Sequence, residues 1–573
     1  RLILRDLKSH NLRPNAPASD NQFVRRVYLD VIGRIPTAKE LAKFHQDTRR
    51  DRRARLIDEL LASPGHVSHM FNWLGDMLRV KDSYYRIGKT WTFHTWLKTQ
   101  LDRNRPWNEM VKEMLTAEGA LGENGPTAYL LRDASMPLDS LSNTLTTFLG
   151  ANVACAQCHD HPFAEWTQRD FYEMAAFFGS TAFDSVDTRK PAKVLADKRF
   201  SKANLVTLLQ PNMERVVFDR TRDTVFPEDY AYDDAKPGQK VVPRFITWDD
   251  AKKKRPSRTS SQRLREHFAD WMTSPDNPRF AAAIANRLWK KLFGAAVKEP
   301  VTDLDDLEDA TNPELLAFIA QLMKDVNFDL RQFQRAVLNT KTYQQQVSVK
   351  PPGGEAFRFP GPLLRRMTAE QAWDSIVLLL RGPEVDAARA DHAPLMKRLV
   401  FPFEITHNRK AIVKDREKIF SFAQSLLGEG KASRGGGGRG LFMQAKKARG
   451  QDQWLRASEL PQPMPPTHFL RIAGQSAREV ADDGSTEGGI TESLAMMNGE
   501  ITQALMKKSA ILKDTHRKKR SKAEQVEFLY KSFFSRPPHE QEKKRSIAAL
   551  AQKLELSDLI WALLNSREFI FIQ

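Results

Sequence analysis

The chain has few cysteines and no long apolar run. Only two cysteines occur among 573 residues, which excludes a disulfide-stapled scaffold and a metal site built from four cysteines. Apolar stretches such as 376–380 are far shorter than the roughly 20 residues of a membrane-spanning helix. The P-loop, the G-x-S-x-G nucleophile elbow and the H-E-x-x-H zinc motif are also missing from the sequence. We therefore expect no transmembrane segment and none of the enzyme classes that depend on these motifs.

Positive charge is in surplus. The chain carries 89 Lys and Arg against 71 Asp and Glu, which gives a net charge of +18 and a pI near 9.7. Such a surface favours polyanions, here an anionic glycan or an acidic protein. The basic clusters at 49–53, 252–255 and 517–520 are short and not interleaved with aromatic residues. We therefore expect no nucleic acid partner.

Most of the sequence has the apolar spacing of amphipathic helices. Capping boxes are predicted to begin helices at Thr37, Thr167, Thr311 and Thr368. Between about 190 and 250, prolines and turn pairs increase, and Val216-Val217-Phe218 favours a strand. The sequence thus predicts a mainly α, multi-helical two-domain protein with a small irregular β/loop connector.

The predicted domain boundaries lie where the sequence changes from helical spacing to the proline-rich stretch and back. We expect a helical domain over 1–185, a loop- and β-rich connector over 186–258 and a second helical domain over 259–573. The second domain contains a glycine-rich loop at 428–440, which cannot pack a core and is expected to be flexible.

The most specific signal is the string Cys155-Ala156-Gln157-Cys158-His159. C-x-x-C-H is the attachment signal of a c-type haem: each thiol forms a thioether with one vinyl group, and the adjacent imidazole becomes the proximal iron ligand. We therefore predict one covalent haem c per chain, with Cys155 and Cys158 as anchors and His159 as the metal ligand. A helix over 138–154 is predicted to lead directly into the cysteines.

Residues near this string have predicted supporting roles. His161 is too close in sequence to His159 to reach the opposite haem face easily, so we expect it to bond a propionate, tune the pocket or act catalytically on a substrate. Asp160 and Glu165 are candidates for orienting an imidazole. The sixth ligand is not assigned by the sequence; the nearby or aromatic-flanked candidates are Met136, Met174, His66, His69 and His94.

Two other cation sites were considered. Cys155, Cys158, His159 and His161 provide four zinc-type ligands, although adjacent Cys158 and His159 would have to converge on one ion. Inert cysteines packed at a helix end are a further alternative. The acidic turn 303–309 has oxygen ligands suited to calcium but lacks the spacing of an EF-hand, and a solvated acidic turn is the favoured interpretation.

Several blocks together carry a family resemblance. The block Phe148–Phe163, which includes the C-x-x-C-H string and continues as His-Pro-Phe, and the block Phe23–Thr37 resemble the first domain of the planctomycete cytochrome-associated family. The remaining blocks resemble its second domain: Asn277–Phe280, Asn286–Trp289, Leu292–Gly294, Asn312–Leu316, Arg366–Gln371, Ser493–Gly499, Ser535–Pro538 and Trp561–Phe569. The resemblance implies an exported protein with two paired domains of unknown function, in a gene setting with sulfatase-like and polysaccharide-degrading systems.

The leading functional hypothesis is an exported, periplasmic or cell-envelope haem protein that transfers electrons. It would act as an oxidoreductase on anionic polysaccharides, or work alongside the enzymes that degrade them. Its partner would be an electron-transfer protein. The residues Arg1 to Asp6 do not form a cleavable signal, so this location follows from where haem c is attached. One alternative is a non-catalytic binding or scaffold protein whose cysteines hold a structural metal or are inert. Another is a haem enzyme that activates peroxide or oxygen at an open iron position.

Overall fold

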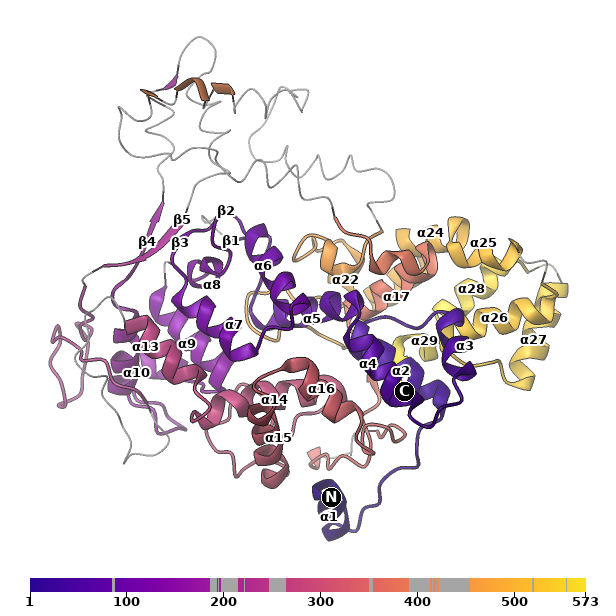
Figure 1. The fold of residues 1–573 in the computed structure, drawn as a ribbon, viewed down its shortest axis with the longest axis horizontal. Coiled ribbons are helices and arrows are strands. Elements are labelled where there is room, and N and C mark those ends of the chain that lie inside the picture. The colour runs from indigo at the N-terminus through magenta and orange to yellow at the C-terminus, as the bar shows by residue number, and fades with distance from the viewer. Residues whose placement is uncertain are drawn as a thin grey trace.

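The computed structural model describes residues 1–84, 88–134, 136–185, 193, 195–196, 215–220, 222–246, 264–349, 354–390, 413–414, 416–418, 420–421, 454–517, 520–552 and 554–573. The protein is mainly helical with only small sheets, as the sequence predicts (Figure 1). The glycine-rich stretch 428–440 and much of the 186–258 connector lie outside the described residues. No helix of the described part is both long and apolar enough to cross a membrane.

The helices up to residue 338 belong to the first two thirds of the chain. They are α1 (Leu2–Ser9), α2 (Asp20–Ile32), α3 (Ala38–Gln46), α4 (Arg52–Leu61), α5 (Pro64–Met77), α6 (Trp91–Asp102), α7 (Trp107–Thr116), α8 (Thr127–Leu131), α9 (Pro137–Leu149), α10 (Gln168–Ala175), α13 (Leu264–Thr273), α14 (Pro278–Phe293), α15 (Pro313–Asp325) and α16 (Leu330–Leu338).

The described helices after residue 368 lie together on the right of Figure 1, next to α2 and α3. They are α17 (Ala369–Arg381), α22 (Phe469–Ile472), α23 (Ile490–Asn498), α24 (Glu500–Lys508), α25 (Ala510–Arg517), α26 (Lys522–Phe534), α27 (Glu540–Ala551), α28 (Leu556–Leu564) and α29 (Arg567–Ile570).

Local capping explains where many helices begin. The predicted boxes at Thr37, Thr167 and Thr368 are present, each with reciprocal bonds between the cap and the third helical residue. The prediction at Thr311 is wrong by one residue: Asn312 caps α15, and its side chain accepts from the Leu315 N–H. The cap moves because the following proline fits the first helical position and asparagine is a strong N-cap.

The sheets are small and antiparallel. The predicted strand at 216–218 is confirmed as β5 (Arg215–Asp219), which lies between β3 (Gly119–Ala120) and β4 (Thr181–Ser185), with Val217 opposite Phe183. The other pairs are β1 (Ser83–Tyr84) with β2 (Gly88–Lys89), and β6 (Arg365–Arg366) with β7 (Phe571–Ile572). The β6–β7 pair connects the middle of the chain to its last residues.

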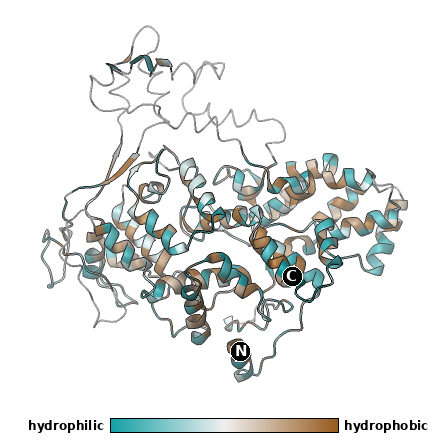
Figure 2. Ribbon diagram, viewed as in Figure 1, coloured by the Kyte–Doolittle hydropathy of each residue, from teal (hydrophilic) through white to brown (hydrophobic). Residues whose placement is uncertain are grey.

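Two large apolar cores are present among the described residues. The larger contains residues between Ile3 and Leu363 and therefore includes helices on both sides of the connector. The smaller contains residues from Met367 to Ile572 together with Leu29 and Ile35. Amphipathic helices supply these cores, with apolar and polar faces side by side in Figure 2. Because α2 contributes to both cores, it connects the two ends of the molecule.

Polar side chains of α2 are also buried. Arg25 donates to the carbonyl oxygens of Phe533 and Phe569 at 2.7 Å, and Arg26 donates to those of Tyr343 and Gln345 at 2.6 and 2.8 Å. We refer to Arg25, Arg26 and Asp30 with their partners as the α2 network. Its bonds join the N-terminal helices to segments several hundred residues later, so the regions on both sides of the connector fold against one another.

Candidate functional site

The cysteine-containing segment lies between α9 and α10. The prediction of an uninterrupted helix to residue 154 is wrong, because Gly150 takes a left-handed conformation at φ +63° and ends α9 at Leu149. A Cβ at Gly150 would lie 2.6 Å from the Leu304 side chain, so glycine also permits this close approach. A short 3-10 helix, Ala154–Gln157, then presents the cysteines. We call residues 155–163 the motif segment.

The three predicted haem-binding residues of the motif segment are exposed. Cys155 and Cys158 are free thiols at the surface, on consecutive turns joined by a Cys158 N–H to Cys155 carbonyl bond of 3.2 Å. The His159 side chain is also exposed, and its Nδ1 lies 2.7 Å from the Asp160 carbonyl oxygen. In the tautomer that this contact requires, Nδ1 carries the proton and the Nε2 lone pair remains available.

These features are compatible with the attachment side of a c-type haem. Both thiols are accessible, and a ligating histidine typically donates its other ring N–H to a carbonyl or carboxylate. Phe163 is 93% exposed beside them and offers an apolar surface that nothing in the described chain covers. His159 Nε2 is therefore an accessible nitrogen that could accept a metal.

His161 is held differently from His159. Its Nδ1 accepts the Phe163 N–H at 3.2 Å, so the proton resides on Nε2, and its own backbone N–H donates to the Trp166 carbonyl at 2.7 Å. The ring is partly exposed and meets Phe163 edge-on. His161 therefore presents an Nε2–H donor at the surface, next to but separate from His159.

Asp160 does not orient an imidazole through its carboxylate. Its Oδ1 accepts the Gln168 N–H at 2.8 Å at the start of α10, and the contact with His159 comes from its backbone carbonyl. Glu165 is exposed. His159 is thus oriented by the main-chain carbonyl of Asp160, whereas the sequence analysis expected a side-chain carboxylate.

Two residues far away in sequence hold the motif segment and Trp166 just after it, and no local sequence pattern indicates either contact. The Tyr232 hydroxyl, in the loop 222–246, accepts the Asp160 N–H at 2.8 Å. The Trp166 indole N–H donates to Asp305 Oδ2 at 3.0 Å. Burial raises the pKa of Asp305, while this bond and the nearby Arg279 act in the opposite direction. Such partners are found only through tertiary structure.

The acidic turn 303–309 takes part in holding the region around the motif segment. Leu304 donates its N–H to the Gly150 carbonyl at 2.7 Å, and Asp309 pairs with Lys298 at 2.6 Å. Among the described residues, no three Cys, His, Asp or Glu side chains converge as a metal-binding group, either here or at the motif segment. The carboxylates of the turn instead fix loop conformation and link the turn to neighbouring residues.

The residues considered as sixth ligands lie elsewhere. Met174 is fully buried, and its sulfur accepts the Ile246 N–H at 3.3 Å. Met136 precedes α9, about 20 Å of helix away from the motif segment. His66 and His69 are buried in α5, and His94 packs in α6 against Phe71 and Trp91. His66, His69, His94 and Met174 are therefore buried within described helices, whereas Met136 is about half exposed.

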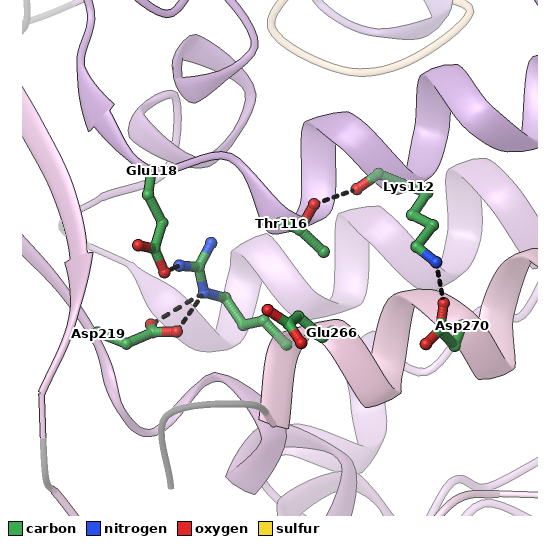
Figure 3. A pocket seen from close by; sticks show the side chains of 7 residues that line it. Lys112, Thr116, Glu118, Asp219, Glu266 and Asp270 are labelled. Atoms are coloured by element: carbon green, nitrogen blue, oxygen red, sulfur yellow. Dashed lines mark hydrogen bonds and ion pairs between the residues drawn. The ribbon is translucent and has the colours of Figure 1, made fainter.

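A concave surface lies between α7, α13 and β5 (Figure 3). It encloses about 470 Å³, and Arg265 reaches across it to Asp219 at 2.9 Å and to Glu118 at 3.0 Å. Lys112 pairs with Asp270 on its rim. Both cations of this pocket are paired with carboxylates of its own lining, and these pairs stabilise the junction of α13 with the sheet.

Two family models match the chain. Residues 1–183 match PSCyt2, described as a protein of unknown function (DUF1549), and residues 264–550 match PSD1, described as a protein of unknown function (DUF1553). The motif segment lies in the first of these regions, and Asp305, which binds Trp166, lies in the second. No curated protein and no solved structure matches the chain.

Proposed function

The chain belongs to the DUF1553 (PSD1) family of unknown function, with a DUF1549 (PSCyt2) region before it, and from this premise we propose that it is an exported c-type haem protein that transfers electrons. Within that family we assign it to the planctomycete cytochrome-associated proteins. When bound, haem supplies one-electron redox chemistry at its iron. The proposed location is the periplasm or cell envelope, where such haem is attached.

The observation that carries this proposal is the geometry at His159. Its Nδ1 is engaged by the Asp160 carbonyl at 2.7 Å, while Cys155 and Cys158 are exposed and unbonded on the preceding turn. Cys155 and Cys158 anchor the group, and His159 holds the iron through Nε2. Gly150 and the Asp305–Trp166 bond fix the direction in which this turn faces.

His161 provides the group that meets a substrate. Its Nε2–H, oriented by the Phe163 N–H to Nδ1 contact, can donate a hydrogen bond or a proton beside the haem-binding turn. The net charge of +18 supports an anionic polysaccharide as the substrate or its setting. The exposed Phe163 supports a redox protein as the electron-transfer partner, since such partners dock on small surface patches.

A second candidate function is favoured by the positions of the sixth-ligand candidates. Met174 and His66 are already hydrogen-bonded in the core, so an iron held by His159 would find neither of them as a further ligand and would keep a position for a small molecule. An open face of this kind is typical of haem enzymes that activate peroxide or oxygen. In such an enzyme, the His161 Nε2–H would be a proton donor within the motif segment.

The decisive experiment is expression with a haem-attachment system, followed by an absorption spectrum and a pyridine haemochrome after acid-acetone extraction. We expect haem to stay with the wild-type polypeptide and to be lost from the double variant Cys155→Ser, Cys158→Ser. The matched control His161→Gln should retain covalent haem, whereas His159→Gln should alter its spectrum. A colourless, folded wild-type protein would contradict the proposal and favour a non-catalytic envelope scaffold with inert cysteines.

Exogenous ligands then separate the two haem functions. An electron-transfer haem with a closed shell should show little spectral change with cyanide or peroxide, whereas an open face should bind cyanide and react with peroxide. The His161→Gln variant should slow only the reaction with peroxide, because its side chain lacks a transferable proton of that kind.

A further inference from the structure

A cavity of about 370 Å³ lies at the junction of the two matched regions, and none of its described lining residues belongs to the motif segment. One wall is the start of α5, with Val67 and Ser68, and a second wall is α6. The third wall comes from the later part of the chain, with Arg389, Ala390 and Glu459. Pockets of this size hold small organic ligands, and they are common where domains meet.

One face of α6 lines the cavity along the helix. The residues that follow one another at helical spacing on this face are Trp91, Thr95, Lys98 and Asp102. They span about 16 Å of helix, because each residue adds about 1.5 Å. The Trp91 ring is partly exposed, and its centre lies 5.1 Å from that of the His94 ring, so one end of the face is aromatic. Asp102 provides a carboxylate at the other end.

A largely buried ion pair fixes the middle of this face. Lys98 Nζ donates to Glu459 Oε1 at 2.8 Å and to the Ser458 carbonyl oxygen at 2.7 Å. The Lys98 and Glu459 side chains are 22% and 3% exposed, and the ammonium lies 4.7 Å from the centre of the Phe71 ring. Each charge has its counter-charge within the pair, so the pair does not require a second ion. A lysine has three N–H donors, and the third donor of Lys98 is left for a ligand.

Other polar groups of the cavity have unused bonding capacity. Ser68 is 3% exposed, and neither its hydroxyl nor that of Thr95 makes a hydrogen bond within the described chain. The same holds for the Asp102 carboxylate. Arg389 uses only Nη1, which donates to two nearby backbone carbonyl oxygens. Its Nε–Nη2 edge is therefore available, and this edge matches the two oxygens of a carboxylate.

The combination of these groups selects among ligands. An inorganic anion would leave Trp91 unused and would be repelled by the Asp102 carboxylate. An aromatic acid would suit Trp91 and Arg389 but leave the hydroxyls and Asp102 without partners, and a neutral sugar would leave the Arg389 edge without one. A sugar ring with one carboxylate uses every group. Its C–H face packs on the aromatic ring, its hydroxyls bond Ser68, Thr95 and Asp102, and its carboxylate bonds Arg389.

We propose that this cavity binds a single uronic acid unit of an anionic polysaccharide. The proposal rests on the proposed function, which names that class of polymer, and it places the recognition of one unit between α5 and α6 instead of at the motif segment. Arg389 binds the carboxylate, Asp102 and Ser68 bind hydroxyl groups, and Trp91 packs against the ring. Since the walls come from both matched regions, the site is complete only when these regions fold together. No bound haem is required.

The test is a calorimetric titration of the full chain with trigalacturonate, its methyl ester and benzoate at equal ionic strength. We expect saturable binding of trigalacturonate and about tenfold weaker binding of the methyl ester, which has the same rings without the charge. Arg389→Gln should weaken only the binding of trigalacturonate, again about tenfold. Ser68→Ala should weaken the binding of both sugars about threefold or more, because it removes a hydrogen bond to the ligand and none within the fold. Arg103→Gln is the matched control, since Arg103 is exposed beside Asp102 but does not line the cavity.

Three results would overturn the site. The first is no saturable binding of trigalacturonate, or equal binding of its methyl ester. The second is equal weakening in Arg389→Gln and Arg103→Gln, which reports general attraction to the basic surface. The third is a preference for benzoate. Titration of the double variant Cys155→Ser, Cys158→Ser separates this site from the haem role. Binding by a chain that never takes up haem keeps the site, whereas a haem-loaded wild type that does not bind trigalacturonate rejects the site alone.

Discussion

Arg25, Arg26 and Asp30 of α2 are 3%, 0% and 1% exposed, whereas Cys155, Cys158 and His159 of the motif segment lie at the surface. The α2 network directs its charges onto carbonyl oxygens and one carboxylate inside the protein. The motif segment has few side-chain contacts and keeps its reactive atoms accessible. A buried charge is stable only where partners surround it, so the charged residues of α2 contribute to the stability of the fold. The exposed motif segment can bind a ligand without disturbing the core.

The largest effect should come from breaking a buried ion pair beside α2. Arg456 is fully buried, donates to Asp374 at 2.9 Å and also pairs with Asp386. Arg456→Ala leaves Asp374 buried and unpaired, and we expect a loss of about 3–5 kcal/mol in the free energy of unfolding, measured in guanidinium chloride. Lys43→Ala, which breaks an exposed pair with Glu59, should cost less than about 1 kcal/mol. Equal losses of stability in Arg456→Ala and Lys43→Ala would show that burial does not distinguish the two ion pairs.

Gly33 tests how tightly the end of α2 packs against α5. Its φ is +73°, and an added Cβ would lie 2.5 Å from His69 Nδ1. Gly33→Ala should cost about 3 kcal/mol, from the left-handed backbone and the clash together. Gly238 has a similar φ of +71° with open space around it, so Gly238→Ala should cost only about 1 kcal/mol. Chemical denaturation of both variants measures the difference, and similar values would argue against close packing at His69.

The buried histidines predict a pH dependence. Burial lowers the pKa of His66 from 6.5 to about 3. Below pH 6.5 the unfolded chain binds a proton that the folded chain excludes, so stability is present above 6.5 and decreases as the pH falls. This histidine alone should cost about 2 kcal/mol between pH 6.5 and 5.

Denaturation at pH 7.5 and pH 5 checks this slope. His66→Gln should lower the number of protons taken up on unfolding by about one. The exposed His45, changed to Gln, serves as the control. An unchanged slope in His66→Gln would show that this histidine titrates in the folded state.

The smallest effect should be at the motif segment. Tyr232→Phe removes the acceptor of the Asp160 N–H, and we expect a stability loss of about 1 kcal/mol or less together with faster alkylation of the thiols by iodoacetamide in the haem-free chain. Tyr230→Phe removes a bond to Asp234 in the same loop without touching the motif segment, so its alkylation rate should match the wild type. Thiols that resist alkylation in the wild type would contradict their exposure.

Local signals predicted much of this fold. The boxes at Thr37, Thr167 and Thr368 and the strand at 216–218 are confirmed, since each depends on residues within a few positions or on side-chain preference. The continuation of α9 beyond Leu149 is wrong because Gly150 was not recognised as a left-handed helix end. The haem-binding roles of Cys155, Cys158 and His159 and the catalytic role of His161 remain predictions.

The sequence by itself determined the helical class, three of the four predicted helix starts and the short string that places two thiols beside a histidine. The tertiary structure decided which charges are buried. Arg25 finds its acceptor on Phe533, 508 residues later, and Asp305 finds Trp166 139 residues earlier. The reason is physical: a cap or a turn is satisfied by neighbours along the chain, whereas a buried charge is stable only where distant segments supply its partners.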